Sequence, residues 1–283
     1  MMFSLFGLGN FSPQIPIDTH ELRNEILVQF AKQPDGNFAV AVKDISTGQE
    51  FLMNAHESFH AASTMKTALL IETFKQASEH KFSLSDSIVI HNDFKSIVDG
   101  SIYSMDSSND GEKDLYQRIG SRLPIQNVLY HMITKSSNFS TNLIVELIGA
   151  KNANNTMHSL GAKDIQVLRG VEDSKAFELG MNNTVTAYDL MVMFDHIAKG
   201  TVVSKKACKE MIRILMDQYY RDIIPAKLPP GIETATKSGS IDKVCHDSGI
   251  VFLPDGRKYV VVLLSRGIAD QNVATDILAT VSR

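Results

Sequence analysis

Strand-forming segments occur near both ends of this chain, and a long helical stretch separates them. Two come early, on either side of turn residues at 44–48, and three come late, where Pro254-Asp255-Gly256 supplies a hairpin turn. The economical assembly is one five-stranded antiparallel sheet built from both termini, with the middle of the chain as an inserted helical lobe. The expected strands are 38–42, 50–53, 232–237, 249–253 and 259–264.

Apolar residues at helical spacing predict the remaining elements. In the segment 18–32, one helix face carries Leu22, Ile26, Leu27 and Phe30. Two polar or irregular stretches, 83–123 and 167–183, are expected to be loops. The other expected helices are 63–80, 124–132, 139–148, 152–160, 184–199, 204–217 and 270–281.

These elements predict an α+β fold in which helices flank the sheet. The sheet domain is expected to be discontinuous, formed by 18–62 and 205–283, with an all-helical domain at 63–204 and an N-terminal extension at 1–17. A chain of 283 residues is long enough to bury a sizeable core.

The composition is that of an ordinary globular protein and limits the partners to expect. Charged residues make up 21% of the chain and the formal net charge is −4, so neither nucleic acid nor an anionic membrane is indicated. No apolar run is long enough to span a bilayer. Cys208 and Cys245 lie in different expected elements and are expected to be free thiols.

Three short motifs carry the chemistry: Ser63-Thr64-Met65-Lys66, Ser136-Ser137-Asn138 and Lys237-Ser238-Gly239. Each is weak alone, because Ser-x-x-Lys occurs about once by chance in a chain of this length. Context distinguishes these motifs from chance occurrences of the same residues. The motif at 63–66 opens an apolar helix, and that at 136–138 lies between two apolar runs. The ordered set indicates acyl transfer through a covalent serine ester.

A serine at a helix N-terminus gains from the unpaired N–H groups and the helix dipole there. Lys66 lies one turn after Ser63 and, if it is desolvated beside another cation such as Lys237, can lose its proton and act as a base. Gly239 lies on an expected strand, where a glycine admits close backbone approach by a ligand. The N–H groups of Ser63 and Ser240 could form an oxyanion hole.

At this point the three motifs resemble the signatures of class A β-lactamases and penicillin-binding proteins. The neighbouring segments 132–144, 183–190 and 247–251 are similar to the same family, and the resemblance covers nearly the whole chain from about residue 20. It implies the fold of that family and a serine hydrolase that works through an acyl-enzyme. The compact length resembles class A enzymes more than the longer transpeptidases.

The resemblance also implies roles for individual residues. Ser63 would be the nucleophile, Lys66 its base partner, and Ser136 the group that passes a proton to the leaving nitrogen. The residues implied to bind substrate are Asn138 for the side-chain amide, Lys237 and Ser238 for the carboxylate, and Ser63 and Ser240 as oxyanion donors.

The deacylating glutamate of the family lies in a loop with the pattern Arg-x-Glu-x-x-Leu-Asn, from which this chain departs. The chain has Arg169-Gly170-Val171-Glu172, with one more residue between arginine and glutamate and without Leu-Asn at the same place. Glu172 is the first candidate and Glu178 the second. The structural alternative is a loop ion pair between Glu172 and Arg169.

Two further departures lie near the second motif. Ser137 stands where class A enzymes usually carry aspartate, and penicillin-binding proteins share this departure. The distance from Ser63 to Ser136 is also longer than usual, which places an insertion around 98–112. This insertion is expected to be a solvated loop, or a changed pocket rim to which Tyr103 contributes.

The leading interpretation is a β-lactamase that opens the cyclic amide. The alternatives are a penicillin-binding D,D-peptidase, an esterase or amidase that deacylates slowly, and a sensor domain that is only acylated. A metal enzyme is the remaining class, because His56-x-x-x-His60 has helical ligand spacing, but an obvious third ligand is lacking.

We expect a monomer that needs no cofactor and takes a small β-lactam or a peptidoglycan-like peptide as its substrate. A periplasmic or secreted location is implied by the family. No signal is visible, because the apolar start Met1–Gly9 lacks a basic region.

Overall fold

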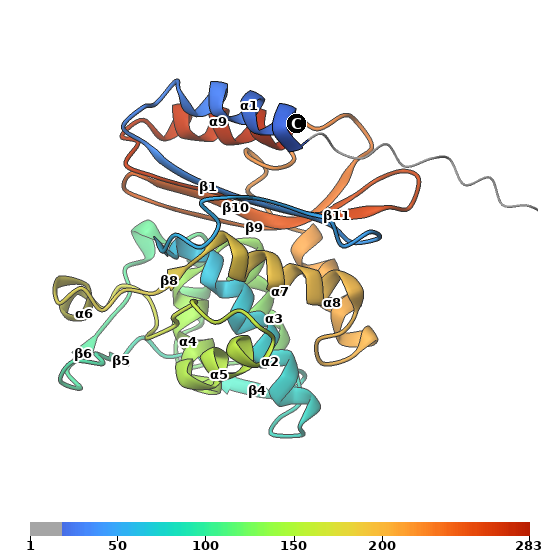
Figure 1. Cartoon of the computed structure of the whole chain (residues 1–283). Coiled ribbons are helices and arrows are strands. Elements are labelled where there is room, and N and C mark those ends of the chain that lie inside the picture. The colour runs from blue at the N-terminus through green and yellow to red at the C-terminus, as the bar shows by residue number, and fades with distance from the viewer. Residues whose placement is uncertain (1–18) are drawn as a thin grey trace, which may run out of the picture.

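The computed structural model of the protein describes residues 19–283 and has a five-stranded antiparallel sheet at its centre (Figure 1). The strand order is β2-β1-β11-β10-β9, so the sheet is built from both ends of the chain, as the sequence predicts. The strands are β1 (Asn37–Asp44), β2 (Glu50–Met53), β9 (Glu233–Ile241), β10 (Val244–Phe252) and β11 (Lys258–Arg266).

The pairing of β1 with β11 joins the two ends of the chain along the whole of both strands, from Asn37 opposite Arg266 to Asp44 opposite Tyr259. Strand β11 is buried from Val260 to Ser265 on both faces. A sheet that is covered on both faces favours such apolar runs, which explains why β11 reads as a continuous rather than an alternating apolar pattern.

Helices α1 (Thr19–Phe30) and α9 (Gln271–Ser282) cover one face of the sheet (Figure 1). Ile26 and Phe30 face the sheet and are buried, as predicted, but Leu27 is 48% exposed, so the predicted face is wrong at that position. Ile26 and Phe30 are one turn apart on the same row of the helix, whereas Leu27 is rotated away from that row toward solvent.

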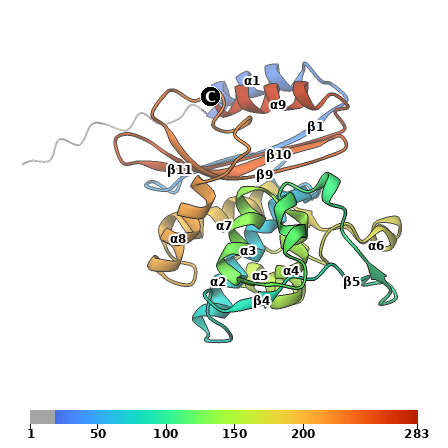
Figure 2. The same ribbon diagram turned by 180° about the vertical axis from the view of Figure 1, so that it is seen from behind.

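The helical lobe covers the other face of the sheet (Figures 1 and 2). Helix α2 runs through the middle of this lobe, and Leu69, Leu70 and Ile71 are completely buried. Helix α8 packs on β9 and also on α3 and α7, so it contacts both parts of the molecule. The lobe helices are α2 (Lys66–Ser78), α3 (Ile125–Thr134), α4 (Asn138–Ile148), α5 (Ala150–Ser159), α7 (Ala187–Lys199) and α8 (Lys205–Met216).

The expected helix at 184–199 begins three residues later than predicted. Thr184 and Val185 form strand β8, which pairs with β3 (Phe59–His60). The hydroxyl of Thr186 then caps α7 by accepting a hydrogen bond from Asp189 N at 3.0 Å. The pairing of β8 with β3 fastens the segment before Ser63 to the start of α7.

The two expected loops contain short regular elements, so the prediction of loops there is only partly right. These elements are too short for a sequence period to reveal. Helix α6 (Ser174–Glu178) lies in the second of them and projects from one side of the molecule (Figures 1 and 2). The others, in the first, are β4 (Ser87–Val89), β5 (Phe94–Lys95), β6 (Ile102–Tyr103), η2 (Ser107–Asn109), η3 (Lys113–Arg118) and β7 (Arg122–Pro124).

Several sequence expectations concern the chain as a whole. The predicted extension at 1–17 lies outside the described residues. Within 19–283, the longest apolar helices are too short to cross a membrane. Cys208 and Cys245 are buried free thiols, as expected. The division into a sheet domain and a helical domain at residue 204 stays a prediction.

Candidate active site

Ser63 lies in the 3-10 turn η1 (Ala62–Met65), which leads directly into α2. The backbone at Ala62 has a φ of +44°, a left-handed conformation that is strained for alanine, and strain of this kind clusters at functional sites. On β9, a Cβ atom added at Gly239 would lie 2.8 Å from Ser63 N, which is closer than real Cβ atoms approach. The strand therefore passes directly beside the serine because residue 239 is glycine.

Two cavities meet at Ser63. One, of about 370 Å³, extends along β9 toward α9 and includes Ser136, Ser238 and Gln271 in its lining. The other, of about 350 Å³, lies on the side of α6 and includes Glu172 in its lining. A nucleophile at the junction of two cavities can be reached by a ligand that fills both.

Lys66 is completely buried beside Ser63 on the first turn of α2. Its Nζ atom lies within hydrogen-bond distance of three acceptors, Ser136 O at 2.7 Å, Asn138 Oδ1 at 2.9 Å and Ser136 Oγ at 3.3 Å. Burial, followed by the positive charge of Lys237, holds the pKa of Lys66 well below its ordinary value. A neutral amine at this position can accept a proton from Ser63.

Lys237 on β9 is also completely buried and also contacts Ser136. Its amine donates to Ser136 Oγ at 3.1 Å and to Ser238 O at 2.8 Å. Burial lowers the pKa of Lys237 to about 7, although the carboxylate of Asp247 opposes this shift. The Ser136 hydroxyl is therefore held between two amines, where it can relay a proton.

Asn138 connects Lys66 to the loop that carries Glu172. Its Oδ1 accepts from Lys66, and its Nδ2 donates to Glu172 Oε1 at 2.8 Å. The glutamate is open to solvent on one side, and partial burial of its carboxyl raises the pKa of Glu172, against the hydrogen bond from Asn138. Glu172 also has a left-handed backbone, with a φ of +61°.

The structure separates the two glutamate candidates. Glu172 lines the cavity beside Ser63, whereas Glu178 is exposed at the end of α6 and lines neither of the cavities that meet at Ser63. Arg169 does not form the expected loop ion pair with Glu172. Its guanidinium donates to Met181 O at 2.9 Å and to Gly170 O at 3.1 Å, and these hydrogen bonds connect the two ends of the loop.

The motif on β9 lies at the edge of both cavities. Ser238 faces the cavity on the side of α9, and Ser240 lines both cavities. The exposed Ser240 hydroxyl donates to Gln271 Oε1 at 3.0 Å. Strand β9 extends four residues beyond its predicted end at 237, so the three motifs converge on one strand edge.

Sequence patterns missed the residues that come from the insertion at 98–112. Asn109 and Gly111 line the cavity on the side of α9, and Asp110 is 6% exposed. Asn109 and Gly111 are exposed at the edge of the cavity, which agrees with the alternative of a changed pocket rim, and the expectation of a solvated loop is wrong at the buried Asp110. A single aspartate within a Ser/Asn/Asp/Gly stretch has no spacing signal, so only its packing reveals it.

The histidine pair suggested as metal ligands has other partners. The ring of His56 packs against Tyr188, with ring centroids 4.6 Å apart. The Nδ1 atom of His60 accepts a hydrogen bond from Ala62 N at 3.1 Å. Across residues 19–283, no group of three or more His, Cys, Asp or Glu side chains is arranged to hold a metal ion.

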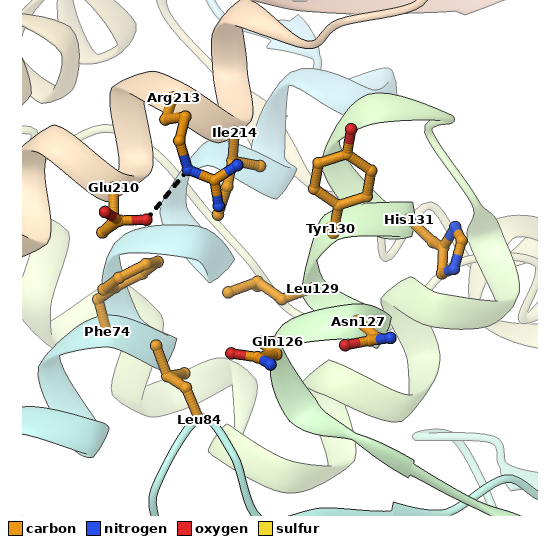
Figure 3. A pocket seen from close by; sticks show the side chains of 10 residues that line it. All are labelled: Phe74, Leu84, Gln126, Asn127, Leu129, Tyr130, His131, Glu210, Arg213 and Ile214. Atoms are coloured by element: carbon orange, nitrogen blue, oxygen red, sulfur yellow. Dashed lines mark hydrogen bonds and ion pairs between the residues drawn. The ribbon is translucent and has the colours of Figure 1, made fainter.

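A larger cavity, of about 590 Å³, lies away from the three motifs, between α2, α3 and α8 (Figure 3). Its charged lining residues, Glu210 and Arg213, pair with each other at 3.1 Å. Its other lining residues are Phe74, Leu84, Gln126, Asn127, Leu129, Tyr130, His131 and Ile214. This cavity contains no nucleophile with an adjacent base, so the chemistry is expected at Ser63.

The fold combines a sheet built from both termini with an inserted helical lobe, and the site places a serine beside two buried lysines. Together these features define a hydrolase of the serine β-lactamase type. The model of the beta-lactamase enzyme family matches residues 21–283, and the chain belongs to that family.

Individual relatives agree with this family. A β-lactamase of Bacteroides uniformis is 24% identical over an alignment of 231 residues, and the match covers 74% of this chain and 77% of that protein. The solved structure of a β-lactamase from Sphaerobacter thermophilus has a TM-score of 0.79 at 22% identity and covers 94% of this chain and 96% of that one. An acyl-enzyme complex of a PBP-A mutant with penicillin G has the same TM-score and identity, with 96% and 97% covered. These likenesses show the fold.

Proposed function

We propose that this protein is a class A-type serine β-lactamase, which hydrolyses the amide bond of a β-lactam through an acyl-enzyme on Ser63. The observation that carries the proposal is the position of Ser136 between the amines of Lys66 and Lys237, beside a nucleophile that opens onto both cavities. This arrangement provides a base, a proton relay and a cation within one site.

Acylation follows from these positions. Lys66, as a neutral amine, takes the proton of the Ser63 hydroxyl as its oxygen attacks the lactam carbonyl carbon. The N–H groups of Ser63 and Ser240 are suited to stabilise the oxyanion. The carbon–nitrogen bond then breaks, and Ser136 passes a proton to the leaving nitrogen. Ser136 regains a proton from Lys66, which took it from Ser63. Lys237 and Ser238 are placed to bind the substrate carboxylate.

Deacylation requires a base that can activate water. Glu172 lies on the cavity that opens at Ser63, and Asn138 holds its carboxylate by a hydrogen bond of 2.8 Å. In the proposed step, Glu172 takes a proton from water as the oxygen attacks the ester carbon. The ester bond to Ser63 breaks, and the proton that Glu172 took from water is returned to the serine oxygen.

The experiment is to mix the protein with a chromogenic cephalosporin and to follow both colour and intact mass. Many turnovers that are lost in Ser63→Ala would support a β-lactamase. The alanine variant should lose at least about 10⁴-fold in turnover, because loss of the nucleophile removes the covalent route. No colour and no mass adduct would reject the proposal and direct attention to other esters and amides.

A penicillin-binding D,D-peptidase or a sensor that is only acylated is the second candidate. One observation favours it, namely that the similar PBP-A structure holds penicillin G as an acyl-enzyme. In the same experiment, this candidate predicts one stoichiometric burst and a persistent adduct on Ser63.

A further inference from the structure

Asp110 is a buried carboxylate that contacts the helix carrying the second motif. Its Oδ2 accepts hydrogen bonds from Phe139 N, in the first turn of α4, at 2.8 Å and from Tyr116 Oη at 3.1 Å. Its Oδ1 accepts from Glu112 N at 2.8 Å. The carboxylate therefore connects the insertion at 98–112 with the N-terminus of α4.

The residues next to Asp110 pack against the same turn. A Cβ atom added at Gly111 would lie 1.9 Å from Lys135 O, so the two backbones are in direct contact there. Glu112 Oε2 lies 3.0 Å from His131 Nδ1 on α3. Three successive residues thus hold the end of α3 and the start of α4.

The turn between these helices contains Ser136 in a strained conformation. Its φ of +54° is left-handed, and such a conformation persists only where the surrounding contacts impose it. Ser137 contributes one of these contacts, since its hydroxyl accepts from Ser140 N at 3.1 Å. This uncharged hydroxyl caps α4 but supplies no negative charge near Lys66, so the carboxylate at the turn comes from Asp110.

We propose that Asp110 is a positioning residue, which holds the strained Ser136 turn against Lys66 and acts on the lysine amine through its negative charge. The inference deepens the proposed function and rests on it for its catalytic meaning. Asp110 touches neither the nucleophile nor the substrate cavity in this role, but acts through Ser136 and Lys66.

The charge of Asp110 has a defined sign of effect on both proton-transfer groups. It raises the pKa of Lys66, against the larger lowering by burial and by Lys237. It also raises the pKa of Glu172, whose rise is due first to burial. The charged and titratable groups that face this cluster are Lys66 from α2, Lys237 from β9, His131 from α3, Tyr116 from η3, and Glu172, Asp106, Glu112 and Tyr220.

Two variants separate the charge of Asp110 from its hydrogen bonds. Asp110→Asn keeps an acceptor for Phe139 N and removes the charge, whereas Asp110→Glu keeps the charge and displaces the acceptor. Asp106→Asn is the matched control, because Asp106 is an exposed carboxylate in the same insertion that caps η2 by accepting from Ser108 N at 2.8 Å. Near-ultraviolet circular dichroism and thermal melting report whether each variant is folded.

The first measurement is the titration of Lys66 by ¹³C NMR of its Cε atom, assigned by its loss in Lys66→Gln. In Asp110→Asn we expect the pKa of Lys66 to move further down, while Asp106→Asn and Asp110→Glu stay close to wild type. An unchanged titration in folded Asp110→Asn would overturn the electrostatic role. If Asp110→Asn does not fold, Asp110→Glu provides the test. A Lys66 titration and an acylation rate equal to those of wild type in Asp110→Glu would support the role of the charge and reject the need for the hydrogen bonds.

The second measurement is the pH profile of chromogenic cephalosporin acylation. We expect the acid limb of Asp110→Asn to move to lower pH, because the charge is lost. Asp110→Glu should react up to about 100-fold more slowly, because the displaced acceptor misplaces the Ser136 turn. In Asp110→Asn, a loss of rate without a shifted limb would indicate a merely structural role. If wild type itself is not acylated, the proposed function fails, and the NMR titration still decides the role of Asp110.

Discussion

Lys66 and Lys237 donate to the same hydroxyl, that of Ser136, at 3.3 and 3.1 Å. Two buried amines at one oxygen cannot both keep a full positive charge without cost, and each lowers the tendency of its neighbour to be protonated. The three motifs meet here as one proton-transfer unit, and the proposed reaction depends on how protons are distributed within it.

Substrate binding should depend on the charge of Lys237. Because the pKa of Lys237 is lowered to about 7, its positive charge is present below that pH and is lost as the pH rises through it. We expect the KM of a carboxylate-bearing cephalosporin to increase across this range. The methyl ester of the same compound is the control and should show no such trend, and Lys237→Gln should remove the trend for the acid. Equal pH profiles for acid and ester would contradict the prediction.

Glu172→Gln should trap the acyl-enzyme. Deacylation is expected to fall by about 10²–10⁴-fold, while acylation changes little, because only the water-activating base is lost. Intact-mass measurement during turnover should show a persistent adduct on Ser63. Glu178→Gln is the matched control, because Glu178 is exposed at the end of α6, and it should turn over like wild type. An adduct that accumulates in Glu178→Gln instead would reverse the assignment.

The pH dependence of deacylation gives a separate test of Glu172. Since burial raises the pKa of this carboxyl, the active carboxylate form is lost as the pH falls through that raised value. We expect the deacylation rate in single-turnover experiments to have an acid limb above the pH at which an ordinary glutamate titrates. The same limb in Glu172→Gln would assign it to another group.

Gly239→Ala should damage activity more than stability. The added methyl group would lie 2.8 Å from Ser63 N and 3.0 Å from Thr64 N, both backbone atoms that cannot rotate away. We expect a loss in kcat/KM of about 10²-fold from displacement of η1 relative to β9. The melting temperature should change less than the activity, and Ser240→Ala, at the exposed next position, is the control for that measurement. Wild-type activity in Gly239→Ala would contradict the prediction, because it would show that Ser63 tolerates the displacement of η1 relative to β9.

Phe194→Ala should strongly destabilise the fold. Phe194 is completely buried on α7, which packs against β11 and β1, so its removal leaves a cavity in the core beside this helix. The expected loss in the free energy of unfolding is about 3–5 kcal/mol, measured by urea denaturation. Phe177→Ala, at a side chain that is 58% exposed, should change it by only about 0.5 kcal/mol or less. Similar values for both would contradict the assigned core.

The sequence predicted the main elements and the three motifs because each depends on local spacing. The five expected strand segments overlap β1, β2, β9, β10 and β11, the five strands of the observed sheet. Predictions failed where a local pattern competes with packing. Leu27 follows the helical period loosely and faces solvent, and Thr184 forms a strand because β3 is available to pair with it. The choice between Glu172 and Glu178 was likewise open, because both lie in one irregular segment.

The sequence by itself therefore determined the α+β organisation and the reacting residue types, since strand periods, helix periods and short motifs are written in neighbouring positions. The tertiary structure decided which groups meet. The hydrogen bond from Asn138 to Glu172, the two lysines on Ser136 and the burial of Asp110 join residues from distant segments. Burial and opposing charges, which set the protonation of these groups, exist only once the sheet and the lobe have packed together.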